Sequence, residues 1–137
     1  CNSPKAIASA MNRATKEKIL SKLADYGADY RFVPFIAVHE FEALLFSDVK
    51  ILASQLKVNP AIVEKILEEC GEPENINNSP ISAPSKRLKR IFNPYKKKTN
   101  GITIANLIGI EKMRNKCPVF HEWLTTLENL QTPFKCN

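Results

Sequence analysis

The sequence predicts a helix-rich α/β domain with one strand and about six short helices. Three observations support this prediction. Residues 31–38 contain a nearly continuous apolar run, which is typical of a strand buried on both faces. Most other segments repeat apolar residues every three or four positions, which is the spacing of an amphipathic helix. The length of 137 residues fits a single domain, residues 1–137, that can bury a core without disulfides or metals.

The first predicted helix begins at Ser3-Pro4, because serine is a good N-cap and proline is well tolerated at the first helical position. Gly27 is a natural stop for this helix. The predicted strand at residues 31–38 follows. Pro34 cannot donate a hydrogen bond to a neighbouring strand, so the strand is expected to be irregular or at a sheet edge.

The remaining helices are predicted from capping residues and apolar spacing. Ser47-Asp48 and Asn59-Pro60 are expected helix starts, and Gly71 is an expected stop. Residues 102–108 fit either a helix or a strand, and the pattern leaves both open. The predicted helices after the strand are residues 48–56, 60–70, 85–92, 111–116 and 118–130.

Composition narrows the class of protein. No apolar run approaches the roughly 20 residues needed to span a bilayer, and no signal peptide is visible, so no membrane partner is expected. The four cysteines are scattered without a CxxC pair, which argues against a compact zinc site and a secreted disulfide scaffold and favours the cytoplasm. Because the chain begins at Cys1 with no natural-looking start, we expect it to be a C-terminal fragment of a longer protein.

The segment His39-Glu40-Phe41-Glu42 is the strongest candidate site. Carboxylates that follow a buried strand stand where open α/β sheets place their sites. Glu40 and Glu42 are candidate ligands for Mg²⁺ or Mn²⁺. His39 is expected to contact these ligands and orient them, without binding the metal itself. The zinc-protease motif is excluded because it needs a second histidine one turn later. The alternative is that both glutamates are solvated residues at a helix start.

The second candidate is a block of basic residues. No acidic residue occurs between Asn75 and Ile110, whereas seven lysines and arginines do. Such a block attracts polyanions, nucleic acid first among them, although it is equally compatible with a solvated face that has no target. The candidate nucleic-acid-binding residues are Ser85, Arg87, Lys89, Arg90, Tyr95, Lys96, Lys97 and Lys98. Lys86 stands at a helix start, where its ammonium group can reach a phosphate, and the alternative is a capped surface helix with ordinary charges.

Other common sites find no support in the sequence. The glycines of a P-loop are missing before Lys86, and no nucleophile elbow is present. His121, near Cys117 and Trp123, is interpreted as a surface or capping residue rather than as a metal ligand.

The sequence resembles the bacterial family known as domain of unknown function 4276. The resemblance rests on VHEFEALLFSD (Val38–Asp48), APSKRL (Ala83–Leu88), Tyr95-Lys96 and the segment Ile104–Leu130. Members of that family look like Toprim-type α/β proteins and are often encoded beside AAA-type ATPases, in an arrangement suggestive of phage defence or DNA processing. The resemblance therefore implies a Toprim-like C-terminal portion and an ATPase partner.

The resemblance also suggests roles by analogy with related Toprim nucleases. Glu40 or Glu42 matches an acid at a late strand end, and Lys86 matches the lysine that stabilises charge on the scissile phosphate. The acidic motifs that such nucleases carry earlier are missing before Arg31, so this chain holds at most half of a catalytic site.

Two functions remain open from the sequence. The first is part of a metal-dependent nuclease or DNA-processing factor that works with an ATPase. The alternative is a non-catalytic module that binds protein or nucleic acid.

Overall fold

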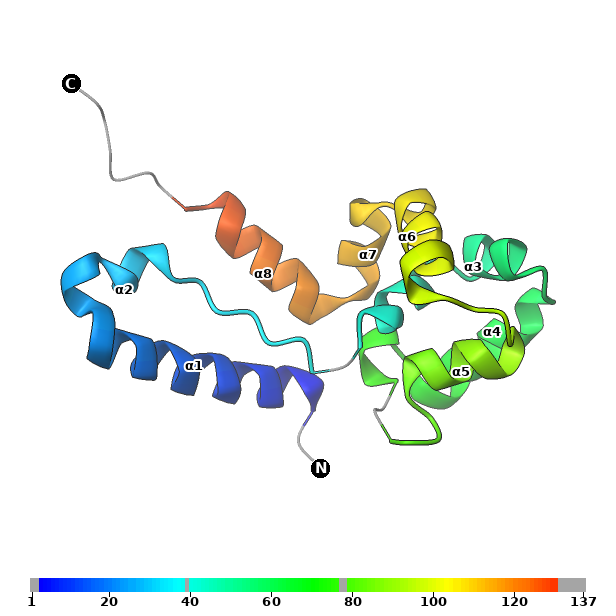
Figure 1. Cartoon of the computed structure of the whole chain (residues 1–137), viewed down its shortest axis with the longest axis horizontal. Coiled ribbons are helices and arrows are strands. Elements are labelled where there is room, and N and C mark those ends of the chain that lie inside the picture. The colour runs from blue at the N-terminus through cyan, green and yellow to red at the C-terminus, as the bar shows by residue number, and fades with distance from the viewer. Residues whose placement is uncertain (1–2, 39, 77–78, 131–137) are drawn as a thin grey trace, which may run out of the picture.

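A computed structural model describes residues 3–38, 40–76 and 79–130, and within these ranges every regular element is a helix (Figure 1). None of these helices is long and apolar enough to cross a membrane. Short 3₁₀ helices are η1 (Ala24–Tyr26), η2 (Phe41–Ser47) and η3 (Pro73–Asn75), and η4 (Lys97–Gly101) is a π-helical turn. The α-helices are α1 (Pro4–Leu23), α2 (Ala28–Arg31), α3 (Val49–Leu56), α4 (Pro60–Cys70), α5 (Pro84–Ile91), α6 (Ile102–Ile108), α7 (Ile110–Lys116) and α8 (Pro118–Glu128).

The predicted α/β class is wrong, and with it the Toprim-like fold. Residues 32–38 are extended but pair with no strand in the described part of the chain. A strand exists only where a neighbouring backbone supplies hydrogen bonds, and an apolar run reports burial rather than pairing. The apolar side chains of this segment pack on a helix instead, since the ring of Phe35 stacks on that of Trp123 in α8 with centroids 4.4 Å apart.

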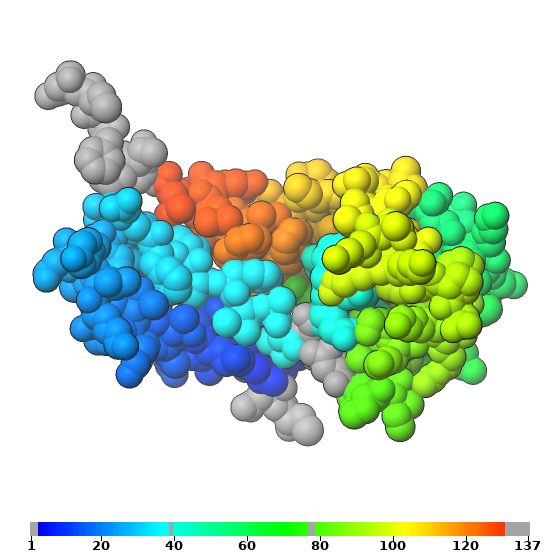
Figure 2. Space-filling view, viewed as in Figure 1, coloured from blue at the N-terminus to red at the C-terminus, as the bar shows by residue number. Residues whose placement is uncertain are grey.

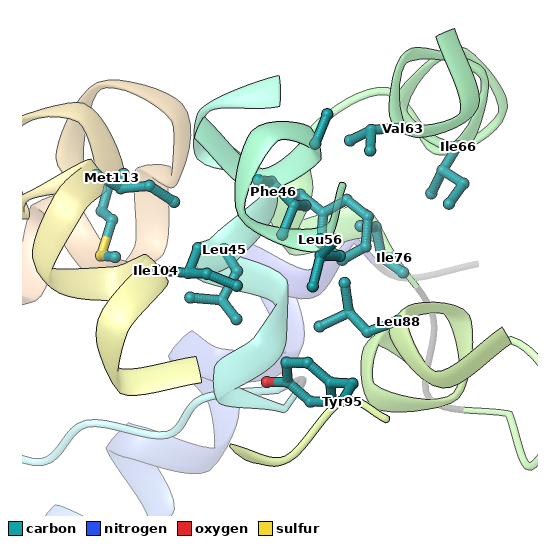
Figure 3. Packing of buried hydrophobic residues seen from close by; sticks show 13 residues of the cluster. Leu45, Phe46, Leu56, Val63, Ile66, Ile76, Leu88, Tyr95, Ile104 and Met113 are labelled. Atoms are coloured by element: carbon teal, nitrogen blue, oxygen red, sulfur yellow. The ribbon is translucent and has the colours of Figure 1, made fainter. Parts of the chain in front are cut away.

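The hydrophobic core is built around η2. This short helix contacts α3, α5, α6, α7, η3 and η4, so it lies at the centre of the helices on the right of Figure 1. Its Leu45 and Phe46 are 0% and 1% exposed. Figure 3 shows them surrounded by side chains from neighbouring elements: Leu56, Val63, Ile66, Ile76, Leu88, Tyr95, Ile104 and Met113.

Several sequence predictions of helix ends are confirmed. Ser3 caps α1, Asp48 caps α3 by accepting the Ile51 N–H at 2.8 Å, and Asn59 caps α4. The open choice at residues 102–108 is settled as helix α6. Helix α1 is continuous over 20 residues.

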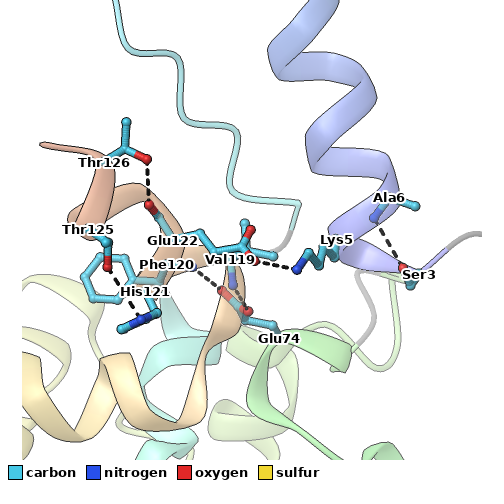
Figure 4. Close-up of polar contacts among 10 residues, drawn as sticks. All are labelled: Ser3, Lys5, Ala6, Glu74, Val119, Phe120, His121, Glu122, Thr125 and Thr126. Carbon is cyan, nitrogen blue, oxygen red and sulfur yellow. Dashed lines mark hydrogen bonds and ion pairs between the residues drawn. The ribbon is translucent and has the colours of Figure 1, made fainter. Parts of the chain in front are cut away.

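Helix α8 joins the N-terminal elements to the core (Figure 4). Glu74 of η3 accepts the N–H groups of Val119 and Phe120, at 2.8 and 3.0 Å, in the first turn of α8. Burial raises the pKa of Glu74 above its usual value, although these two hydrogen bonds act in the opposite direction. On its other side, α8 contacts α1 through an ion pair between Lys5 and Glu122.

A buried sulfur contact lies behind the core. Cys117, which is fully buried just before α8, has its sulfur 3.4 Å from the hydroxyl oxygen of Ser47 at the end of η2. Burial raises the pKa of the Cys117 thiol to about 12. The thiol is therefore protonated at neutral pH and acts as a small apolar side chain.

Candidate site at the start of helix α5

Glu40 and Glu42 stand at the start of η2, Glu40 just before the helix and Glu42 in its first turn. Glu40 precedes this helix in an extended conformation and is half-buried, whereas Glu42 lies in the first turn and is 2% exposed. The 3₁₀ turn brings both carboxylates toward the start of α5 and the segment before α6. The site is therefore made from three separate parts of the chain.

Glu40 caps helix α5 from a distance in sequence. Its Oε2 accepts the backbone N–H of Ser85 at 2.8 Å. The helix begins with Pro84, and the Ser85 N–H is one of the first-turn donors that has no partner within the helix. An anion at this position also interacts favourably with the helix dipole.

The environment of Glu40 favours its charged form. Burial alone would raise the pKa of Glu40, but hydrogen bonds from Ser85 and the charges of Lys97 and Lys86 outweigh this effect and hold the pKa below its usual value. The start of α5 and the turn η4 both reach the first turn of η2, because Ser85 binds Glu40 and Lys97 binds Glu42. The structure thus brings Glu40 and Lys86, two of the predicted catalytic residues, into the same neighbourhood.

Glu42 is a buried carboxylate with an incomplete set of partners. The Lys97 Nζ lies 3.0 Å from its Oε2, but no hydrogen bond of standard geometry reaches that oxygen from the described residues. The same ammonium group lies 5.6 Å from the centroid of the Phe41 ring. Because the Lys97 side chain is 56% exposed, its attraction for Glu42 is weakened by water.

Tyr95 closes the site from the core side. It is 3% exposed, and its hydroxyl makes no hydrogen bond of standard geometry within the described chain. Burial, followed by the negative charges of Glu42 and Glu40, raises the pKa of Tyr95, so the hydroxyl remains protonated. A Cβ atom on Gly101 would approach this oxygen to 2.8 Å, so a glycine is needed where η4 passes Tyr95. Tyr95 is thus a packed residue of the site and is not exposed for stacking on a base.

The other predicted nucleic-acid-binding residues divide into two groups. Arg87 is held by the carbonyl oxygen of Ser82 at 2.9 Å and by Glu69, and Arg90 donates to the carbonyl oxygen of Ile81. Lys89, Lys96 and Lys98 are exposed, and none of them forms an ion pair with a described residue. His39 lies outside the described residues.

Sequence reasoning missed several polar contacts that shape the molecule. Asp48 forms an ion pair with Lys112 of α7 as well as capping α3. Arg114 binds Glu128 at 2.9 Å and also contacts Thr125 and His121 of α8. The two members of each pair are separated in the sequence, so no local pattern predicts these contacts.

A comparison with protein-family models finds a match over residues 2–128 to a domain of unknown function, DUF4276. The chain belongs to the DUF4276 family. No curated protein and no solved structure matches it. The family resemblance inferred from the sequence motifs is therefore confirmed, whereas the fold that it implied is not.

The two carboxylates of this DUF4276 chain are already engaged with groups of the protein. Among the residues that the structure describes, no group of three or more histidine, cysteine, aspartate or glutamate side chains is placed to hold one. Glu40 is engaged with the start of α5 and Glu42 with the ammonium of Lys97, so a cation would compete with existing positive partners. We therefore derive no metal-dependent step from this site.

Replacing Glu40 by glutamine should weaken the attachment of η2 to α5. We expect the free energy of unfolding at neutral pH to fall by about 1 kcal/mol, which is typical of losing a charged helix cap. The pKa of Glu40 is lowered in the folded state, so its contribution is present above the usual value of 4.5 and is lost as pH falls below it.

Urea denaturation of both proteins across this pH range measures the effect. The difference in stability between the wild type and Glu40→Gln should shrink as the solution becomes more acidic. A difference that is absent at neutral pH, or that grows in acid, would contradict the capping role.

Proposed function

We propose that this chain binds nucleic acid through its phosphate backbone. The binding surface, here named the basic surface, consists of Lys86 and Lys89 of α5 and of Lys96, Lys97 and Lys98 around η4. The observation that supports the proposal most directly is that both segments are attached to the first turn of η2, α5 through the bond from the Ser85 N–H to Glu40 and η4 through the ion pair of Lys97 with Glu42.

Most lysines of the basic surface have no negatively charged partner in the described chain, so the surface can attract anions. Four of its lysines form no ion pair within the described chain, and the exception is Lys97, which binds Glu42. No acid occurs between Asn75 and Ile110 to neutralise them. Figure 2 shows α5 and the residues leading into α6 on the same face of the molecule. Clustered exposed lysines of this kind hold a phosphate backbone without reading bases.

The two glutamates support this surface rather than oppose it. Glu40 anchors the first turn of α5, which carries Lys86, and Glu42 anchors the turn that carries Lys97. Both carboxylates are less exposed to solvent than the lysines, since Glu42 is buried and Glu40 is half-buried. Their role in the proposal is to position cations.

The test is binding of a fluorescently labelled DNA duplex measured by anisotropy over a series of salt concentrations. The double variant Lys89→Ala/Lys98→Ala should bind more weakly and reduce the slope of log affinity against log salt by about two, or about one per lost phosphate contact. Lys18→Ala/Lys22→Ala on α1 removes the same charge from the other end of the molecule and should leave the slope unchanged (Figure 1).

Equal losses in both double variants would mean that only net charge matters and would refute a defined surface. Adding Mg²⁺ or Mn²⁺ to the same mixtures separates binding from hydrolysis, because cleavage shortens the DNA. Metal-dependent cleavage, an ATPase partner and a cytoplasmic location remain predictions from the sequence.

A further inference from the structure

The extended segment at residues 33–37 has backbone groups without partners. None of its N–H or C=O groups forms a hydrogen bond with another described residue, although Val33, Phe35 and Ile36 are half-buried. Backbone groups in partly buried positions normally find a partner. Figure 2 shows this segment at the surface between α1 and α8.

A cavity of about 440 Å³ lies beside the same segment. Val33, Pro34 and Phe35 form one wall, and residues of α1 and α8 form the others. This volume falls within the range of ordinary ligand sites. The aromatic rings of Phe35 and Trp123, stacked on one another, give the cavity an apolar floor.

Two of the residues that line this cavity also carry a buried polar atom without a partner. The Asn12 Oδ1 of α1 is an acceptor and the Trp123 Nε1 of α8 is a donor, and neither has a hydrogen bond within the described chain. If the side chains of Asn12 and Trp123 turn toward the cavity, an occupant would supply a donor to the first and an acceptor to the second. It must also satisfy a row of backbone groups along the third wall.

We propose that this groove binds an extended polypeptide segment of a partner protein. A peptide backbone alternates N–H and C=O groups along its length, so one ligand chemistry satisfies the segment at residues 33–37, Asn12 and Trp123 together. Binding of an extended peptide along free backbone groups is a common recognition mode, in which main-chain hydrogen bonds give affinity and pockets select side chains. Apolar side chains of the peptide would pack on the aromatic floor.

This surface is distinct from the basic surface. The groove is formed by α1, residues 33–37 and α8, whereas the lysines proposed to bind nucleic acid lie on α5 and around η4. The inference goes beyond the proposed function and does not depend on it. Loss of DNA binding would leave the peptide site intact, and the reverse is also expected.

The probe is a capped synthetic peptide of alternating threonine and valine, and the control is the same peptide with every backbone amide N-methylated, so that neither edge of the extended chain can donate. Calorimetry should detect binding of the first peptide and not of the second, because N-methylation removes the donors while keeping the side chains. Binding should also slow hydrogen exchange of the Val33, Phe35, Ile36 and Ala37 amides. Equal binding of both peptides, or binding without this protection, would overturn the proposal.

Variants of the two walls provide an independent measurement. Trp123→Phe keeps an aromatic ring but removes the N–H, and Asn12→Ala removes the acceptor. Each should weaken peptide binding about three- to tenfold, the usual loss for one hydrogen bond. Asn106→Ala, at an exposed position on α6, is the matched control and should bind as the wild type does.

Two results would assign the groove differently. Failure of the peptide to bind wild-type protein at millimolar concentration would refute the site. Self-association that protects the same amides without added peptide would identify a second copy as the occupant and would refute a separate partner.

Discussion

Replacing Phe46 by alanine is expected to lower the free energy of unfolding by about 3–5 kcal/mol. The side chain is 1% exposed and lies in η2, the helix on which six other elements converge. Truncation removes the ring from the centre of the cluster that joins α3, α5 and α6, and those rigid helices cannot all move inward to fill the space. Guanidinium denaturation followed by circular dichroism measures the loss.

Two further variants keep this test informative if Phe46→Ala does not fold. Phe46→Leu retains most of the apolar volume and should lose less stability. Ile81→Ala changes a side chain that is 71% exposed and should stay within about 0.5 kcal/mol of the wild type. Similar losses at positions 46 and 81 would contradict the placement of η2 at the centre of the core.

Replacing Glu42 by methionine is expected to raise the free energy of unfolding by about 1–3 kcal/mol, because the exposed Lys97 ammonium that it leaves behind stays in water. The carboxylate is buried, its Oε2 accepts no hydrogen bond of standard geometry from the described residues, and its ion-pair partner Lys97 is 56% exposed. Taking a charge out of water under these conditions is unfavourable, whereas a methionine of similar volume fits an apolar site. Chemical denaturation and the DNA-binding assay should be run on the same preparation.

Stability and DNA binding, measured on the same variant, together test why position 42 carries a charged side chain. We expect Glu42→Met to be more stable yet to bind DNA less tightly, because Lys97 loses the group that positions it. Glu64→Met removes an exposed acid of α4 that forms no ion pair with a described residue, and it is the control for the change in net charge. A fall in stability of more than 1 kcal/mol in Glu42→Met would show that the ion pair with Lys97 contributes more than its exposure suggests.

The sequence predicted the helices well because their signals are local. Asp48 and Asn59 cap helices through atoms two or three residues away, and apolar spacing reports which face of a helix is covered. The strand at residues 31–38 failed because a strand depends on a second segment, which no local pattern contains. The helix-or-strand ambiguity at residues 102–108 has the same origin.

The residues of the site could be predicted from the sequence, but the contacts that they make could not. The motif around Glu40 and Glu42 and the basic block were recognisable from composition and spacing. What could not be read was that the Glu40 carboxylate, 45 residues before Ser85, would cap α5 rather than stand open toward a metal. The burial of Tyr95, predicted as a nucleic-acid contact, likewise depends on how η4 passes Gly101.

The burial of Cys117 determines when its thiol can react. Because its thiol is sealed behind η2 and holds its proton, alkylating and oxidising reagents reach it only when the core opens. Cys70 differs in that it is only partly covered and packs at the edge of the core. Reaction of Cys117 with a thiol reagent therefore reports whether the hydrophobic core has opened.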